Sequence, residues 1–225
     1  MKTKIVDSKI KVLLLITGSI AAVRIPLLVS QLAKENYEIR CVLSKNAEKL
    51  IKPLSLSILS RNPCVLENDQ WSNSQSTPLH IELSNWADVL IIAPLTATTL
   101  AKWVTGNAEG LIPSILIANL KPIIVAPAMN TQMWLNKAVQ KNYENLQKYE
   151  NVLSLQPSEG LLACDAIGIG KIPPNDLIQL ALEFIASHKH YGYRKDLINK
   201  EILITGGCTS EKIDAARQIT NKSSG

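Results

Sequence analysis

The stretch Pro122-Ile-Ile-Val-Ala-Pro-Ala-Met-Asn-Thr-Gln-Met-Trp134 decides the fold of this chain. Its first residues form a short apolar run with the length of a buried strand. Asn130 is therefore expected just past a strand end, where open α/β sheets bind their ligands. An amide donates and accepts hydrogen bonds at once, so Asn130 suits a carboxylate or a substrate amide.

Two interpretations of this stretch stay open on the residues alone. Met129, Met133 and Trp134 can wall a flat apolar ligand beside the amide of Asn130. Alternatively, Asn130 is simply the cap of a helix that follows a strand-to-helix turn. Both interpretations predict a polar side chain at the end of a buried strand.

Outward from this strand, apolar runs of strand length alternate with helical patterns. The expected strands are residues 11–16, 38–43, 89–93, 123–126 and 152–155. The expected helices are residues 21–32, 47–51, 98–104, 112–119, 136–148 and 176–187. This alternation predicts an α/β fold, a doubly wound and Rossmann-like parallel sheet with helices on both faces.

The composition indicates one sizeable domain and excludes several function classes. The 225 residues are 46% hydrophobic, which is enough to build a core. The net charge is +5, but Lys and Arg are scattered and only 4% of residues are aromatic, so no nucleic-acid partner is expected. Phosphorylated small molecules are the expected anions. The uncharged stretch 89–101 is too short to span a bilayer, so no membrane partner is expected either.

The cysteines indicate neither a metal site nor a disulfide framework. The four of them lie far apart and form no CxxC pair: Cys41, Cys64, Cys164 and Cys208. A reducing, cytoplasmic location fits this pattern.

Three strand ends carry small and hydroxyl residues. Gly18-Ser19-Ile20 follows the first strand and opens a helix, whose free N–H groups suit a phosphate. This loop is not GxGxxG, so no dinucleotide is indicated, and a plain turn explains it equally well. Ala93-Pro94-Leu95-Thr96-Ala97-Thr98-Thr99 holds the same position after another strand and offers three hydroxyls, and Ser44 follows a third strand.

Two further side chains are candidates for chemistry. His80 precedes an amphipathic segment, but a lone histidine is more often structural or at the surface than catalytic. Cys164 lies in a glycine-rich stretch that suits a mobile flap, and its thiol can donate a proton. The alternative for Cys164 is a small buried apolar residue.

A set of motifs in the right order resembles the flavin-dependent cysteine decarboxylases, in particular those that act on phosphopantothenoylcysteine. The resemblance covers roughly residues 9–185 and is most specific in the octapeptide 127–134 and in the block that begins at His80. The motifs are Gly18-Ser-Ile-Ala-Ala22, His80-Ile-Glu-Leu-Ser-Asn-Trp-Ala-Asp88, Ala93-Pro-Leu-Thr-Ala97, Pro127-Ala-Met-Asn-Thr-Gln-Met-Trp134, and Gly160-Leu-Leu-Ala-Cys164 running on to Gly170-Lys171.

The resemblance implies an FMN-binding enzyme that converts 4′-phospho-N-pantothenoylcysteine to 4′-phosphopantetheine and carbon dioxide, on the route to coenzyme A. It implies no metal, and it implies a homo-oligomer built from trimers. The implied catalytic residues are His80, Asn130 and Cys164. The implied FMN-binding residues are Gly18, Ser19, Ile20, Ser44, Pro94, Thr96, Ala97, Thr99 and Met129. The implied contacts of the small phosphorylated cysteine substrate are Asn130, Met133, Ala163 and Lys171.

Two other functions compete with this one. The first is another flavin enzyme of the same fold, either a peptidyl-cysteine decarboxylase or a flavin prenyltransferase. The second is a non-catalytic flavin-binding regulatory subunit. The presence of His80, Asn130 and Cys164 together favours phosphopantothenoylcysteine decarboxylation.

The composition shifts near Ser187. We expect residues 1–187 to form the FMN-binding decarboxylase domain and the polar residues 188–200 to form a linker. Residues 201–225 resemble the opening of the synthetase (ligase) domain that many bacteria fuse behind the decarboxylase, although Cys208 and Ser210 depart from its usual pattern. They are expected to be a truncated start of that domain, without ligase activity.

Overall fold

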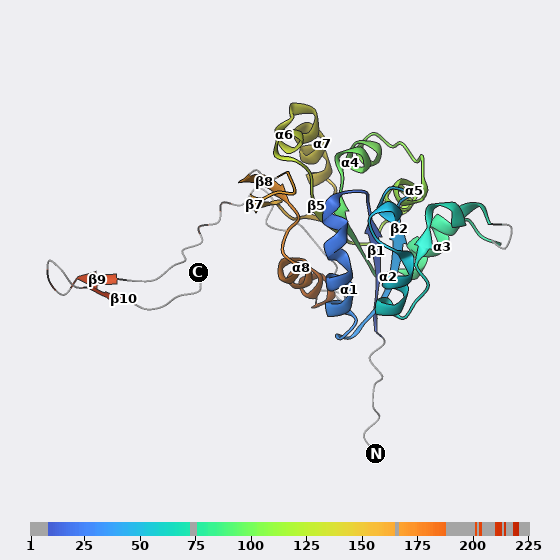
Figure 1. The fold of residues 1–225 in the computed structure, drawn as a ribbon, viewed down its shortest axis with the longest axis horizontal. Helices are drawn as coiled ribbons and strands as arrows, with labels where there is room; N and C mark the ends of the chain where they lie inside the picture. Colours follow the sequence, from blue (N-terminus) through green and yellow to red (C-terminus); the bar gives the residue numbers. More distant parts are fainter. Residues whose placement is uncertain are drawn as a thin grey trace, which may run out of the picture. The chain divides into compact units, whose positions relative to one another are not determined.

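The computed structural model of the chain describes residues 9–72, 76–164 and 167–187, with short pieces at 201, 203, 210–212, 214 and 218–220. The chain divides into two compact units, residues 1–194 and 195–225. The first unit is an open α/β sheet covered by helices (Figure 1).

Six parallel strands form this sheet in the order β3-β2-β1-β4-β5-β6. The strands are β1 (Ile10–Ile16), β2 (Tyr37–Leu43), β3 (Val65–Leu66), β4 (Val89–Leu95), β5 (Ile123–Pro127) and β6 (Val152–Ser154). The chain adds β2 and β3 on one side of β1 and then returns to add β4 on the other side. The strand order therefore reverses between β1 and β4, and such a reversal opens a crevice at the carboxyl ends of the strands. The predicted doubly wound fold is confirmed.

Side chains alternate between two cores along β1. Val12, Leu14 and Ile16 belong to one apolar cluster, and Leu13 and Leu15 belong to the other. The first cluster is completed by the helices α1 (Ile25–Leu32), α2 (Pro53–Ser60) and α8 (Asn175–Ser187). The second is completed by α3 (Leu79–Trp86), α4 (Ala97–Val104), α5 (Leu111–Ala118), α6 (Thr131–Leu135) and α7 (Lys137–Gln147). Helices thus cover both faces, which explains the continuous apolar runs of the strands.

The helix expected at residues 21–32 consists of two parts. A 3-10 helix, η1 (Ile20–Arg24), leads into α1, and Pro26 lies in the first turn of α1. Proline lacks the N–H that a continuous α-helix needs at this point, so the α-helix begins anew just before it. The short helix expected at 47–51 is the 3-10 helix η2 (Ala47–Lys49).

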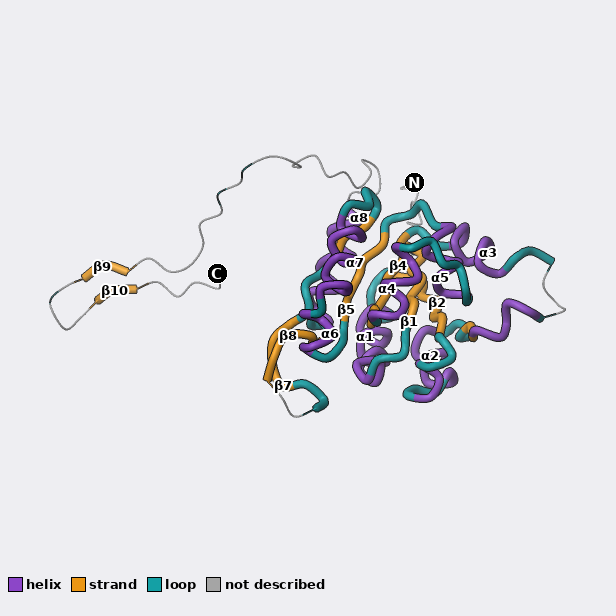
Figure 2. The backbone as a smooth tube through the Cα atoms, turned by 90° about the horizontal axis from the view of Figure 1, so that it is seen from above, coloured by secondary structure: helices purple, strands orange, loops and turns teal. Residues whose placement is uncertain are grey.

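An antiparallel hairpin, which the strand pattern did not predict, follows the sheet. Its strands are β7 (Ser158–Leu161) and β8 (Ile167–Lys171). In both views of the molecule β8 lies beside α6, close to the end of β5 (Figures 1 and 2). The glycine-rich stretch around Cys164 therefore lies next to the strand end that carries Asn130.

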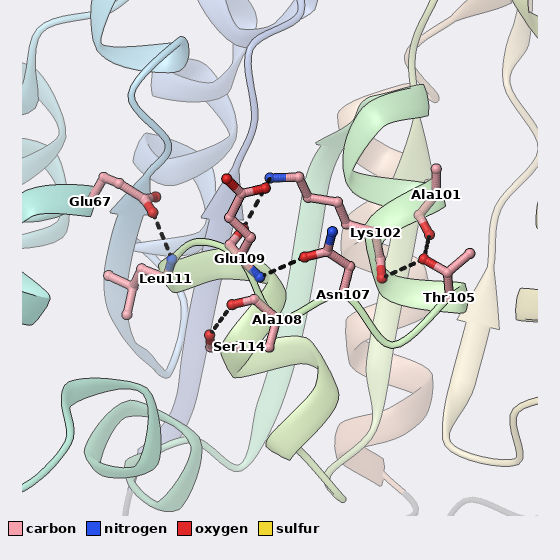
Figure 3. Close-up of polar contacts among 9 residues, drawn as sticks. All are labelled: Glu67, Ala101, Lys102, Thr105, Asn107, Ala108, Glu109, Leu111 and Ser114. Carbon is pink, nitrogen blue, oxygen red and sulfur yellow. Dashed lines mark hydrogen bonds and ion pairs between the residues drawn. The ribbon is translucent and has the colours of Figure 1, made fainter.

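The turn between α4 and α5 is fixed by charged side chains (Figure 3). Glu67, from the 3-10 helix η3 (Glu67–Trp71), accepts a hydrogen bond from the Leu111 N–H at 2.7 Å and so caps α5 from a distant part of the chain. Lys102 pairs with Glu109 at 2.9 Å across the same turn. These contacts fix α5 relative to α4 and to η3.

In the second unit, β9 (Ser210–Lys212) and β10 (Gln218–Thr220) pair in an antiparallel arrangement. The linker expected at 188–200 and most of the truncated domain expected at 201–225 lie outside the described residues. Within the described part of the chain, no helix is long and apolar enough to cross a membrane.

Candidate functional site

A cavity of about 450 Å³ lies where the loops after β1 and β5 meet the β7–β8 hairpin. Three separate chain segments line it: Ser19, Ile20, Ala21, Val23 and Arg24; Ala128, Met129 and Asn130; and Leu161, Leu162, Ala163, Cys164, Gly170, Lys171 and Ile172. The cavity opens at the carboxyl edge of the sheet, as the strand order predicts.

Asn130 caps a helix with one end of its amide and faces Cys164 with the other. Its Oδ1 accepts a hydrogen bond from the Gln132 N–H at 2.8 Å and so caps α6. Its Nδ2 lies 3.5 Å from the Sγ of Cys164 and donates toward it. The interpretation of Asn130 as a helix cap is therefore confirmed. Of the three apolar residues expected to wall a ligand, only Met129 lines the cavity, because Trp134 is buried in the core.

Two glycines let the hairpin approach the Asn130 loop closely. The Met129 N–H donates to the Gly170 carbonyl at 2.9 Å. A Cβ on Gly170 would stand 2.1 Å from the Met129 oxygen, and one on Gly168 would stand 2.3 Å from the Thr131 hydroxyl. Only glycine allows this backbone contact, and the contact brings Cys164 to Asn130.

The other predicted strand-end residues make hydrogen bonds and close contacts within and between their loops. The side-chain oxygen of Ser44 accepts from the Ala47 N–H, and that of Thr96 accepts from the Thr99 N–H. A Cβ on Gly18 would stand 2.4 Å from the Asn46 Cβ, so the loops after β1 and β2 touch. Of the predicted cofactor residues, Ser19, Ile20 and Met129 line the cavity, whereas Gly18, Ser44, Pro94, Thr96, Ala97 and Thr99 do not.

His80 lies at a different place in the chain. It stands in the first turn of α3 and lines a second cavity of about 420 Å³ together with Gln70, Trp71, Ser72, Ser76, Thr77, Pro78 and Leu79. Leu79 and Leu83 anchor α3 in the core, and the Ser84 hydroxyl donates to the His80 carbonyl at 2.8 Å. A single chain therefore brings Asn130, Cys164, Ala163 and Lys171 together, without His80.

Sequence reasoning missed Val23 and Arg24, which line the cavity. Val23 and Leu27 are exposed, at 49% and 66%. The buried residues Ile25, Leu28, Val29 and Leu32 define the inner face of α1. Val23 and Leu27 fall outside that register, which is the signal that marks them as surface residues. Met133 is likewise half exposed and does not line the cavity.

No cluster of three or more His, Cys, Asp or Glu side chains able to hold a metal occurs within the described residues. Cys41, Cys64 and Cys164 are free thiols, and of these Cys164 is exposed. The chemistry available at the cavity is that of an amide, a thiol, two cations and apolar walls.

The fold is a doubly wound parallel sheet, and its cavity at the carboxyl edge is lined by apolar and cationic side chains. This combination is typical of the nucleotide-binding class of α/β proteins. The comparisons with known proteins narrow this class. The chain belongs to the Flavoprotein family, whose model matches residues 2–186. A second model, the DNA/pantothenate metabolism flavoprotein C-terminal domain, matches residues 197–225.

Similar full-length proteins are bifunctional. The chain is 33% identical over 217 residues to the coenzyme A biosynthesis bifunctional protein CoaBC of Bacillus subtilis, covering 95% of this chain and 52% of that protein. It is 36% identical over 216 residues to the protein of the same name from Escherichia coli, covering 96% and 51%. The chain thus spans about half the length of these relatives.

Solved structures share the fold of the first unit. A mutant PPC decarboxylase complexed with pantothenoylaminoethenethiol superposes with a TM-score of 0.72 at 34% identity, over 80% of this chain and 99% of that one. The FMN binding protein AtHal3 gives a TM-score of 0.68 at 35% identity, over 78% and 96%.

Proposed function

We propose that this chain binds FMN and decarboxylates 4′-phospho-N-pantothenoylcysteine to 4′-phosphopantetheine. The observation that carries the proposal is the contact between the Asn130 amide and the Cys164 thiol at the edge of a ligand-sized cavity. The similar PPC decarboxylase and the CoaBC relatives support the same reaction.

The residues present fit a flavin nucleotide. Ile20, Val23 and Met129 supply apolar walls for a flat ring, and Ser19 supplies a hydroxyl at the start of η1. Arg24 and Lys171 supply positive charge for phosphate and carboxylate groups. We propose that Ser44, Pro94, Thr96, Ala97 and Thr99 shape the cofactor site from the adjoining strand ends. When bound, FMN would supply the two-electron oxidation and reduction that let a cysteine carboxylate leave.

The protein's own groups would orient the substrate and deliver a proton. The Asn130 Nδ2 is the donor that can hold the substrate carboxylate or the neighbouring amide. The Cys164 thiol holds a proton beside that donor and can pass it to a carbanion-like centre of the substrate. Ala163 and Lys171 lie on the same hairpin and would contact the rest of the substrate.

We further propose that the protein works as a homo-oligomer built from trimers, in which His80 of one subunit meets Asn130 of another. Two observations support this proposal: His80 and Asn130 lie at separate cavities, and apolar side chains that line the first cavity are exposed, among them Ile20, Val23 and Leu161. Met133 would then lie at an interface between subunits and contact the substrate there. Exposed apolar groups of this kind are typical of protein interfaces.

We propose residues 1–187 as the decarboxylase domain, 188–200 as a linker and 201–225 as the start of a ligase-type domain. The two family matches, to residues 2–186 and 197–225, support this division. A cytoplasmic location is also proposed, because the described cysteines are free thiols.

Release of carbon dioxide tests the proposed activity. The purified protein is loaded with FMN and incubated with 4′-phospho-N-pantothenoylcysteine, and carbon dioxide and 4′-phosphopantetheine are quantified. A peptide ending in cysteine serves as the alternative substrate. Turnover of the peptide alone would identify a peptidyl-cysteine decarboxylase, and turnover of neither would contradict the proposal.

A further inference from the structure

We propose that Thr17 is the positioning residue that joins the two central loops of the FMN site, and that FMN affinity depends on its hydroxyl. Thr17 follows directly after β1 and is only 1% exposed, so it cannot touch a ligand itself. The inference rests on the proposed function, because it concerns the cofactor of that same site.

The Thr17 hydroxyl bridges the strand-order reversal between β1 and β4. It donates to the Pro94 carbonyl at 2.6 Å and accepts from the Thr96 N–H at 3.1 Å. Its oxygen also lies 3.3 Å from the Thr96 hydroxyl. One buried side chain therefore satisfies a backbone acceptor near the end of β4 and a backbone donor at the start of the loop that follows it.

The Thr17 contacts continue into both loops. The Thr96 hydroxyl lies 3.2 Å from the Thr99 hydroxyl and accepts from the Thr99 N–H, so it caps α4. On the other side, the Thr17 carbonyl accepts from the Ser19 N–H at 2.9 Å, which shapes the turn into η1. Ser19 in turn lines the cavity. Thr17 thus fixes the cap of α4 relative to the cavity residue Ser19.

Thr17→Val replaces the hydroxyl by a methyl group and keeps the shape of the side chain. The Pro94 carbonyl and the Thr96 N–H then lose their hydrogen-bond partner. Buried backbone groups cannot stay unpaired without cost, so the two loops must move apart or admit water. FMN is proposed to be held by both loops, so it needs a fixed distance between them. When that distance changes, the FMN dissociation constant should rise. Thr17→Ser retains the hydroxyl and should restore the spacing.

The test measures the FMN dissociation constant of apoprotein by the quenching of flavin fluorescence. We expect Thr17→Val to bind FMN about tenfold more weakly or worse and Thr17→Ser to stay within about threefold of the unchanged protein. Thr105→Val is the matched control, because the Thr105 hydroxyl also bonds a backbone carbonyl, that of Ala101 at 2.8 Å, but lies at the far end of α4. Thr105→Val should leave the affinity unchanged.

A second measurement separates positioning from general stability. The melting temperature of each apoprotein is recorded beside its FMN affinity, and Thr96→Val is combined with Thr17→Val. If Thr17 acts through Thr96, the double variant loses less affinity than the product of the two single losses. A lower melting temperature with unchanged FMN affinity in Thr17→Val, or multiplicative losses, would overturn the inference.

Two further outcomes are decisive. Should Thr17→Val not fold, Thr17→Ala is compared with Thr17→Ser at equal folded concentration, and equal FMN affinities would overturn the inference. Failure of the unchanged apoprotein to bind FMN at all would overturn the proposed function, and this inference with it.

Discussion

At the scale of single residues, Asn130 joins structure to chemistry, because its two amide atoms face different partners. Asn130→Asp keeps an oxygen for the Gln132 N–H and removes the donor toward Cys164. We expect the stability of the protein to change little, whereas decarboxylation falls by about a hundredfold or more through loss of the donor and charge repulsion of the substrate carboxylate. The measurement is the rate of carbon dioxide release.

Asn136→Asp is the matched control for this variant. Asn136 caps α7 in the same manner, since its Oδ1 accepts from the Ala138 N–H at 2.9 Å, but it does not line the cavity. Equal loss of activity in both variants would show that the loss does not come from the position of Asn130 at the cavity.

Cys164 is expected to act as a proton donor rather than as a packing residue, since its side chain is exposed at the cavity. A serine hydroxyl is a far weaker acid than a thiol, so Cys164→Ser should lower the rate of 4′-phosphopantetheine formation about a hundredfold. FMN affinity should not change. Cys64→Ser, far along the chain from the hairpin, serves as control, and normal turnover by Cys164→Ser would contradict the assigned role.

The sequence predicted the residues that line the cavity better than it predicted their arrangement. Ser19, Met129, Asn130 and Cys164 were identified from strand-end positions and resemblance, and they do come together. The link through Thr17 could not be predicted, because its partners Pro94 and Thr96, at the end of β4, lie 77 and 79 residues away. Hydrogen bonds between loops depend on tertiary packing, which local patterns do not encode.

At the scale of secondary-structure elements, the β7–β8 hairpin is the least tolerant of added side chains. Gly170→Ala places a Cβ against the Met129 oxygen and forces a left-handed φ of 134° on alanine. We expect the hairpin to separate from the Asn130 loop, which raises KM and lowers kcat and also increases proteolytic cleavage within residues 158–171.

Gly106→Ala provides the control for backbone strain alone. Gly106 also has a positive φ, 72°, but a Cβ there would meet nothing within 4 Å. Its cost should be about 1 kcal/mol of stability, without an effect on KM. If Gly170→Ala behaved in the same way, close contact with Met129 would not be what positions the hairpin.

The long, apolar elements were predictable and the short ones were not. All five expected strands are present in the sheet, because buried parallel strands give continuous apolar runs. Helix α2 was missed because its sequence alternates apolar and serine residues, and Leu54 and Ile58 are indeed exposed. The cap of α5 by Glu67 was equally hidden, since the two residues lie 44 positions apart.

At the scale of the whole molecule, buried acidic groups should limit stability at high pH. Burial raises the pKa of the Cys64 thiol from 9.0 to about 12, and burial likewise raises the pKa of the Cys41 thiol and of the Tyr143 hydroxyl. The unfolded chain loses these protons first. Stability is therefore complete below about pH 9 and declines as pH rises toward the folded-state values.

Urea denaturation between pH 7 and pH 11 measures this decline. Cys41→Val removes one of the buried acids and should flatten the alkaline slope relative to the unchanged protein. An identical slope in both proteins would argue against the buried Cys41 thiol as a source of the slope.

Assembly of the whole molecule can be tested by complementation between subunits. If His80 and Asn130 of different chains meet, mixed oligomers of His80→Asn and Asn130→Asp should contain some intact sites. Dissociating and reassociating the two inactive proteins together should restore part of the activity, and light scattering should show a trimer or a multiple of it. A stable monomer at micromolar concentration, or no regained activity, would contradict the proposed assembly.

The lining of the cavity begins at Ser19 and ends at Ile172, so nearly all of the first unit must leave the ribosome before any ligand can bind there. Until then the nascent chain depends on the strands and helices that have already emerged. Ligand supplied in the cell can then stabilise only the finished unit. It should rescue variants with a loosened hairpin, but not variants whose central strands fail to form.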